Sequence, residues 1–156
     1  MLESDDGKIW IGTENGLNCL DPRTGKIKIF LHNPADSTTL SDNWINYLYQ
    51  DRPGRILACT PTGVNVMNAQ TGKVVQYKSS LAGLRNTPSN NINFIGQDSR
   101  GDFWVGSDFG VVRYDTTTRE NVRYLNRPDD PVYLTTMLIM FMKMLIIKSG
   151  LALTMV

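Results

Sequence analysis

The chain repeats itself with a period of 47 residues. Gly16, Gly63 and Gly110 stand at equal steps along it. The same step relates Trp10, Leu57 and Trp104, then Gly12, Cys59 and Gly106, and also Asp21, Asn68 and Asp115. Self-similarity at a period of about 20 to 50 residues is the signature of repeat architectures. The chain is therefore an array of equivalent units, and its fold must be one that such units can build.

Each unit contains four short apolar segments of strand length. In the second copy they lie at residues 45–49, 56–59, 64–67 and 74–77, separated by turn-forming residues. Glycine suits the hairpins between them because it tolerates positive φ, and Asp bonds the backbone of its own turn. A four-stranded antiparallel sheet repeated at this length is a propeller blade. Helical arrays need amphipathic segments of about ten or more residues, and none precedes Met137.

The first and third copies share a longer motif, Gly-x-[Ile/Phe]-Trp-[Ile/Val]-Gly-[Thr/Ser]-x-x-Gly-[Leu/Val], which an Asp and an aromatic strand follow. This motif resembles the two-component regulator propeller repeat. The resemblance extends over about residues 3–134 and is partial in the second copy, where Leu57 replaces the Trp and Cys59 replaces the Gly. It implies blades of the extracytoplasmic sensor of hybrid histidine kinases, which detect oligosaccharides in gut Bacteroides-type bacteria. Similar short motifs occur in propeller enzymes of the streptogramin lyase type.

We expect an all-β chain that forms a partial β-propeller of about three four-stranded antiparallel blades. The propeller region is residues 1–134, with blade copies at about 1–31, 45–77 and 92–125. The chain opens in mid-blade, so we expect a fragment whose first blade has lost its innermost strand. Propellers close with about four or more blades. The expected partners are therefore the remaining blades, and open sheet edges predict self-association.

The repeat register disappears after residue 134. Residues 135–156 are rich in Met, Leu and Ile, a composition foreign to the rest of the chain. A membrane helix needs about 18 to 20 apolar residues, whereas Lys143 and Lys148 interrupt this run. A buried core helix is another possibility. We interpret the tail as an out-of-frame remnant of a fourth repeat, because codons allowed for these residues, read in another frame, spell a blade motif with its Trp near position 151.

The composition indicates no metal, cofactor or nucleic-acid chemistry. His32 is the single His, and no cluster of His, Cys or carboxylate residues has metal-ligand spacing, so we expect no metal and no cofactor. Cys19 and Cys59 stand alone on expected strands, which favours core thiols over a disulfide or a nucleophile. A net charge of +1 with dispersed basic residues argues against a nucleic-acid surface.

The residues that recur most regularly are expected to be structural. Trp10 and Trp104 stand between apolar neighbours at one repeat position, which indicates packing between adjacent blades. Asp51 and Asp98 precede a turn glycine by three residues. A carboxylate placed there accepts backbone N–H groups, so we interpret both as turn caps and not as a catalytic pair.

Ligand recognition is expected where the copies differ, because a repeat scaffold carries binding on its variable loops. Asn91 holds the place of Trp44 one period later, so the blade does not require this ring, which could stack on a sugar. The alternative is that Trp44 fills the channel-side core. The candidate ligand-binding residues are Asn43, Trp44, Asn46, Arg85, Asn90 and Asp108. No catalytic residue is predicted.

Two functions remain open. The first is a non-catalytic sensing module, which the resemblance implies to be a glycan-responsive, periplasmic sensor fragment; this chain shows no kinase residues. The second is a streptogramin-lyase-like enzyme, which requires a His, acidic partners and a divalent ion, whereas the single His lies on a variable loop. The first residues have neither the basic nor the apolar segment of a signal peptide.

Overall fold

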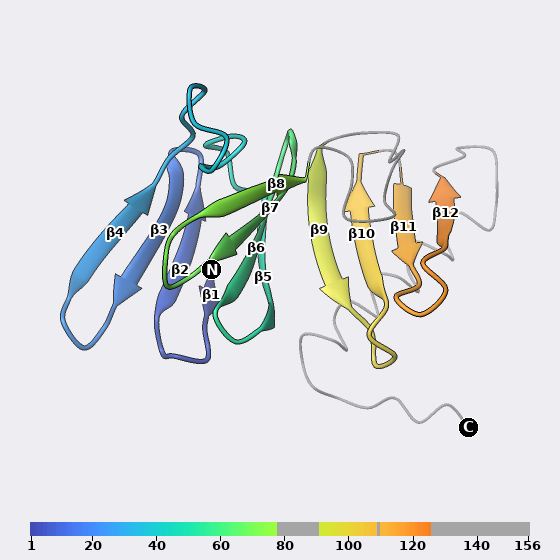
Figure 1. The fold of residues 1–156 in the computed structure, drawn as a ribbon, viewed down its shortest axis with the longest axis horizontal. Helices are drawn as coiled ribbons and strands as arrows, with labels where there is room; N and C mark the ends of the chain where they lie inside the picture. The colour runs from blue at the N-terminus through green and yellow to red at the C-terminus, as the bar shows by residue number, and fades with distance from the viewer. Residues whose placement is uncertain (78–90, 109, 126–156) are drawn as a thin grey trace.

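The computed structural model describes residues 1–77, 91–108 and 110–125 of the chain. Every regular element within these ranges is a strand, and the strands form three four-stranded antiparallel sheets (Figure 1). The first sheet contains β1 (Leu2–Glu3), β2 (Ile9–Thr13), β3 (Gly16–Asp21) and β4 (Lys26–Phe30). The second contains β5 (Tyr47–Arg52), β6 (Arg55–Thr60), β7 (Gly63–Asn68) and β8 (Val74–Tyr77). The third contains β9 (Ile92–Gln97), β10 (Phe103–Ser107), β11 (Gly110–Tyr114) and β12 (Asn121–Leu125).

In every sheet the strands pair in chain order, which makes each sheet a simple meander. Figure 1 shows the innermost strands β1, β5 and β9 near the middle, with β4 and β12 at opposite ends of the molecule. β5 contacts β1 and β2 on one side and β9 on the other. Meanders set side by side around a common centre are propeller blades, so the predicted all-β partial propeller of about three blades is confirmed.

The hairpin turns follow the repeat. Gly54 and Gly101 occupy equivalent turns with φ of 72° and 84°, a region that side chains rarely adopt. Asp98 caps its turn: one carboxylate oxygen accepts the backbone N–H groups of Arg100 and Asp102 at 2.9 and 3.1 Å. The same role predicted for Asp51 is not seen among the described residues. Its buried Oδ1 has no hydrogen-bond partner and lies 3.5 Å from Nε of Arg55.

Each sheet has a front face, turned toward the next sheet in the chain, and a back face, turned toward the preceding one. β6 shows both, because successive side chains of a strand point to opposite faces. Ile56 and Ala58 belong to the cluster shared with the first sheet, whereas Leu57 and Cys59 belong to the cluster shared with the third. All four are fully buried. The second sheet is therefore packed on both faces.

Two hydrophobic clusters fill the spaces between the sheets. The first joins Trp10, Leu17 and Cys19 to residues that include Ile56, Ala58, Met67 and Val74, together with Leu40 and Ile45 of the connecting segment. The second joins Leu57, Cys59 and Val64 to Ile92, Ile95, Val105 and Val112. The predicted packing of Trp10 between blades is confirmed. Trp104 follows the alternation of β10 onto the front face of the third sheet, away from the second sheet.

The structure corrects one expectation about the first blade. We expected its innermost strand to be missing, but two residues of that strand, Leu2 and Glu3, pair with β2. The tail predictions concern residues 135–156, which lie outside the described residues. In the described part of the chain, no helix has the length and apolar character needed to cross a membrane.

Candidate ligand-binding site

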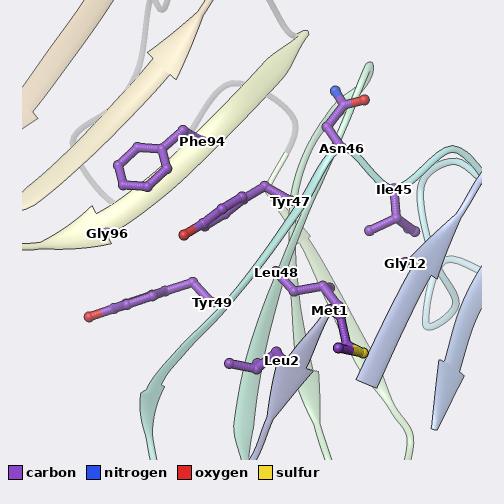
Figure 2. A pocket seen from close by; sticks show the side chains of 10 residues that line it. All are labelled: Met1, Leu2, Gly12, Ile45, Asn46, Tyr47, Leu48, Tyr49, Phe94 and Gly96. Atoms are coloured by element: carbon purple, nitrogen blue, oxygen red, sulfur yellow. The ribbon is translucent and has the colours of Figure 1, made fainter. Parts of the chain in front are cut away.

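A pocket of about 390 Å³ lies on the inner strands of the three sheets (Figure 2). Its lining comes from β1, β2, β5, β9 and the segment before β5, and comprises Met1, Leu2, Gly12, Ile45, Asn46, Tyr47, Leu48, Tyr49, Phe94 and Gly96. Figure 2 shows the rings of Tyr47 and Tyr49 on the same side of β5, directed toward Phe94 and Gly96 on β9. Its volume falls within the range of about 300 to 1,000 Å³ that small-molecule sites occupy.

The aromatic wall of the pocket follows the repeat. Phe94 stands one period after Tyr47, and Gly96 stands one period after Tyr49. The rings of Tyr47 and Phe94 lie 4.9 Å apart, tilted by 53°, which is a favourable aromatic pair. A Cβ atom on Gly96 would come within 2.9 Å of the Phe94 ring. The glycine therefore lets this ring lie flat along β9 and leaves Tyr49 facing the pocket.

The side chains that line the pocket combine apolar surface with a few polar groups. Burial raises the pKa of both tyrosines, so their hydroxyl groups stay protonated at neutral pH. The Tyr49 hydroxyl also interacts with the backbone N–H of Gln97. None of the side chains that line the pocket carries a formal charge at neutral pH. The site can therefore offer flat apolar surface, hydroxyl groups and the amide of Asn46.

The structure brings two of the predicted site residues, Asn46 and Asp108, into one hydrogen-bonded cluster. The amide nitrogen of Asn46 donates to Asn91 Oδ1 at 3.0 Å and to the carbonyl of Ile92 at 2.9 Å. The two oxygens of Asp108 accept from the amides of Asn91 and Asn93 at 2.6 and 2.7 Å. This cluster fastens the start of β5 to β9. Asn46 thus links the cluster to the pocket, which it also lines.

The cluster holds its carboxylate in the charged form. Hydrogen bonds from Asn93 and then Asn91 lower the pKa of Asp108 below its ordinary value, because both amides stabilise the ionised group. Asp108 is exposed, so it presents a fixed negative charge to solvent beside the inner strands. Its oxygens are already shared with two amides, which indicates a structural role alongside any contact with a ligand.

Trp44 does not fill the core. Trp44 is 49% exposed, so the alternative that it is buried in a core is wrong. Its backbone N–H donates to Asp42 Oδ1 at 2.9 Å, which shapes the turn that carries the ring. The next two residues, Ile45 and Asn46, line the pocket. An exposed indole therefore stands immediately before the pocket segment in the chain.

Asn43 is committed to the architecture of this segment. Its side-chain oxygen accepts the backbone N–H of His32 at 2.7 Å, and its carbonyl accepts the N–H of Gly16 at 2.7 Å. These bonds tie the connection between the first two sheets to the β2–β3 hairpin. The other predicted residues, Arg85 and Asn90, lie outside the described residues.

The sequence analysis missed the aromatic residues of the pocket. Tyr47, Tyr49 and Phe94 were not predicted because ligand recognition was expected on the variable loops. Two features of the sequence nevertheless indicated them. Tyr47 and Phe94 are aromatic at the same repeat position. Tyr47 and Tyr49 also alternate along one expected strand, which places both on one face. Repeated aromatic residues on the innermost strands therefore pointed to the channel side.

The single His and the two Cys are engaged in the fold. The ring nitrogen Nδ1 of His32 lies 2.6 Å from the carbonyl oxygen of Leu40. Cys19 and Cys59 are free and buried, and burial raises the pKa of both thiols, as expected of core cysteines. Among the described residues, no group of three His, Cys, Asp or Glu side chains is placed to hold a metal ion.

The three packed meanders, with a pocket on their inner strands, define a class, a propeller-type module built from a repeated blade. Residues 86–109 match the family described as "Two component regulator propeller". The chain therefore carries a two-component regulator propeller repeat, and the resemblance drawn from the blade motif is confirmed. No match was found among curated proteins.

Two solved structures that this chain is similar to come from B. thetaiotaomicron. The extracellular domain of the putative hybrid two component system BT4673 is 22% identical, with a TM-score of 0.59, over 78% of this chain and 17% of that one. The extracellular domain of the putative hybrid two component system BT3049 is 19% identical, with a TM-score of 0.48, over 76% of this chain and 22% of that one. The chain spans about a fifth of the length of these domains. The BT4673 comparison supports the propeller fold.

Proposed function

We propose that this chain is a non-catalytic ligand-sensing module, a part of the extracytoplasmic propeller sensor of a hybrid two-component system. The observation that carries the proposal is the pocket on the inner strands, lined by aromatic residues at repeated positions of a propeller. The two-component regulator propeller match and the likeness in fold to an extracellular sensor domain support the same assignment.

The ligand that best suits the pocket is an oligosaccharide. A sugar ring has an apolar C–H face and hydroxyl groups around its edge. Tyr47, Tyr49 and Phe94 supply aromatic surface, while the tyrosine hydroxyls and the Asn46 amide supply hydrogen-bonding groups. Trp44 adds an exposed ring for a further sugar unit. Because the lining side chains are uncharged, the pocket favours a neutral saccharide over an acidic one.

No observation among the described residues favours the streptogramin-lyase alternative. That reaction needs a His and acidic partners that converge on a substrate. His32 instead binds the carbonyl of Leu40 in the connection between the first two sheets, and it does not line the pocket.

Isothermal titration calorimetry with maltohexaose, cellohexaose, chitohexaose and trigalacturonic acid tests the proposal. We expect saturable binding of at least one neutral hexaose and none of the acidic trimer. Tyr49→Ala should weaken that binding about tenfold through loss of the aromatic face. Tyr49→Phe is the matched control that keeps the ring. Absence of binding to every hexaose, or turnover of a streptogramin-type lactone, would reject the sensor assignment.

A further inference from the structure

Asp108 stands at one end of a series of side-chain amides that leads to the pocket. Its two oxygens accept from the amide nitrogens of Asn91 and Asn93 at 2.6 and 2.7 Å. An ionised carboxylate has no proton to donate, so both amides must turn their nitrogen toward it. The oxygen of each amide then lies on its other side, where Asn46 is found. Nδ2 of Asn46 is 3.0 Å from Asn91 Oδ1 and 3.5 Å from Asn93 Oδ1.

The direction of the Asn46 amide follows from its acceptors. Its nitrogen also donates to the backbone carbonyl of Ile92 at 2.9 Å, and a carbonyl can only accept. The NH2 group has two protons, which the Asn91 oxygen and the Ile92 carbonyl both take at close range. Figure 2 shows the amide nitrogen of Asn46 on the side of β9 and its oxygen turned away from β9. The acceptor half of this amide therefore remains for the pocket that Asn46 lines.

The repeat explains why Asn46 bonds across to the third sheet. Asn93 stands one period after Asn46 and bonds within its own sheet to Asp108, the residue that follows β10. Pro61 holds the place of Asp108 in the second copy, and its side chain has no acceptor. The amide of Asn46 therefore has no carboxylate at the equivalent place in its own sheet, and it donates to the start of β9 instead.

We propose that Asp108 is a positioning residue of the ligand site, which fixes the Asn46 amide so that its oxygen is the atom available to the pocket. The inference rests on the proposed ligand-sensing function and adds a rule of selection to it. An oxygen that can only accept requires a ligand group that donates, such as a sugar hydroxyl. A ligand that offers only acceptors at this place, such as an ether oxygen, leaves the Asn46 oxygen unpaired and binds more weakly. Asp108 thus influences the choice of ligand without lining the pocket.

Proton exchange of the Asn46 side chain tests this orientation without any ligand. In the isotope-labelled chain, NMR should show the Asn46 Nδ2 protons exchanging with water at least about fivefold more slowly than those of the exposed Asn15, because hydrogen-bonded protons are protected. Asp108→Asn should remove most of this difference. An amide at position 108 offers one oxygen and one NH2 group, so Asn91 and Asn93 no longer both have to turn their nitrogen toward it.

Glu14→Gln is the matched control for the loss of charge. Glu14 is exposed and holds the place of Asp108 in the first copy, so this variant removes the same charge from the equivalent hairpin. It should leave the exchange of the Asn46 protons unchanged. Rapid exchange of these protons in the wild type, or unchanged protection in Asp108→Asn, would overturn the proposal. Equal losses of protection in Asp108→Asn and Glu14→Gln would do the same.

Calorimetry with maltohexaose, cellohexaose and chitohexaose tests the consequence for binding. For the hexaose that the wild type binds, Asn46→Ala should weaken binding about five- to tenfold, because the acceptor is lost. Asp108→Asn should weaken it about threefold, because the acceptor is presented only part of the time. Asp108→Asn should have no further effect in the Asn46→Ala background, since it acts through Asn46. Circular dichroism should show the wild-type β-sheet spectrum for every variant.

Two results of the calorimetry would contradict the positioning role. One is equal affinity of the wild type and Asp108→Asn. The other is a full additional loss when Asp108→Asn is combined with Asn46→Ala, which would show that Asp108 acts by another route. If none of the hexaoses binds the wild type, the proposed function fails, whereas the proton exchange of Asn46 still decides whether Asp108 orients the amide.

Discussion

Trp10 and Trp104 occupy the same repeat position, and each makes equivalent contacts within its own blade. Trp10 stacks on Phe30 with ring centroids 5.8 Å apart and an interplanar angle of 22°. Trp104 stacks on Tyr124 at 5.9 Å and 18°. Both indole N–H groups donate at 3.1 Å, to Ser4 Oγ and to Asp98 Oδ2 respectively. The blade motif alone therefore fixes the position and orientation of this ring.

Burial separates the two residues. Trp10 is fully buried because the second sheet covers it, whereas Trp104 is only partly buried on the front face of the third sheet. The sequence of a blade therefore determines where the indole ring lies. The stability that the ring contributes depends on whether a neighbouring blade buries it. Substitutions at equivalent positions can measure this division directly.

The largest difference should appear when the two rings are removed. Trp10→Ala should lower the free energy of unfolding by about 3–5 kcal/mol, because it empties a fully packed space between sheets. Trp104→Ala should cost about 1–2 kcal/mol, since it removes one ring stack and one hydrogen bond. Urea unfolding followed by circular dichroism measures both values. Equal losses would break the comparison.

A second, smaller difference is expected at the glycines two residues further on. A Cβ atom at Gly12 would lie 2.5 Å from Cγ2 of Ile45, whereas at Gly106 the nearest atom would be Cβ of Phe94 at 3.6 Å. Gly12→Ala should therefore cost about 1–3 kcal/mol through overpacking. Gly106→Ala should change stability by less than about 0.5 kcal/mol.

The same unfolding assay measures the glycine pair. Cys59 holds this repeat position in the second copy, so the repeat accepts a side chain where the facing sheet leaves room. A cost for Gly106→Ala as large as that for Gly12→Ala would show that the blade, and not its neighbour, requires the glycine.

The sequence could predict what each blade determines by itself. Glycines such as Gly54 and Gly101 predict the hairpin turns, because these turns require a positive φ that glycine adopts readily. Short apolar runs between those turns predict the strands. The meander, the number of blades and the position of Trp10 followed from these local rules.

The packing between blades could not be predicted from the sequence of a single copy. In the sequence the second copy looks degraded, because Leu57 and Cys59 replace the Trp and Gly of its neighbours. The structure shows that this pair fills the space in front of the second sheet completely. The burial of this pair depends on the facing sheet. The unpaired Oδ1 of Asp51 is a local effect instead, because Pro53, which has no N–H, stands where Arg100 donates to Asp98.

The candidate site was predicted only in part for the same reason. Asn46 and Asp108 lie far apart in the sequence and meet because the second and third sheets pack together. The exposure of Trp44 depends on the course of the segment between the first two sheets. The pocket itself needs three inner strands at once, so no single copy of the repeat contains it.

The smallest expected difference concerns Ser4 and Asp98, which accept hydrogen bonds from the two indole groups. Only the contribution of Asp98 to stability is expected to depend on pH. Burial opposes ionisation of Asp98, but hydrogen bonds from Trp104, Arg100 and Asp102 outweigh it and lower the pKa below its ordinary value of 3.8. A carboxylate with a lowered pKa in the folded state contributes stability above the unfolded pKa. That contribution is lost as the pH falls through the folded value. Ser4, the equivalent acceptor in the first sheet, does not titrate.

Asp98→Ser gives the third sheet the acceptor that the first sheet uses. We expect it to lower the free energy of unfolding at pH 7 by no more than about 1 kcal/mol, because the carboxylate is close to solvent and screened. The difference from wild type should shrink as the pH falls below 3.8. Urea unfolding between pH 7 and about pH 2.5 follows this change, and Ser4→Ala serves as the control whose effect stays constant. A wild-type advantage that persists at the lowest pH would mean that Asp98 acts through its shape and not its charge.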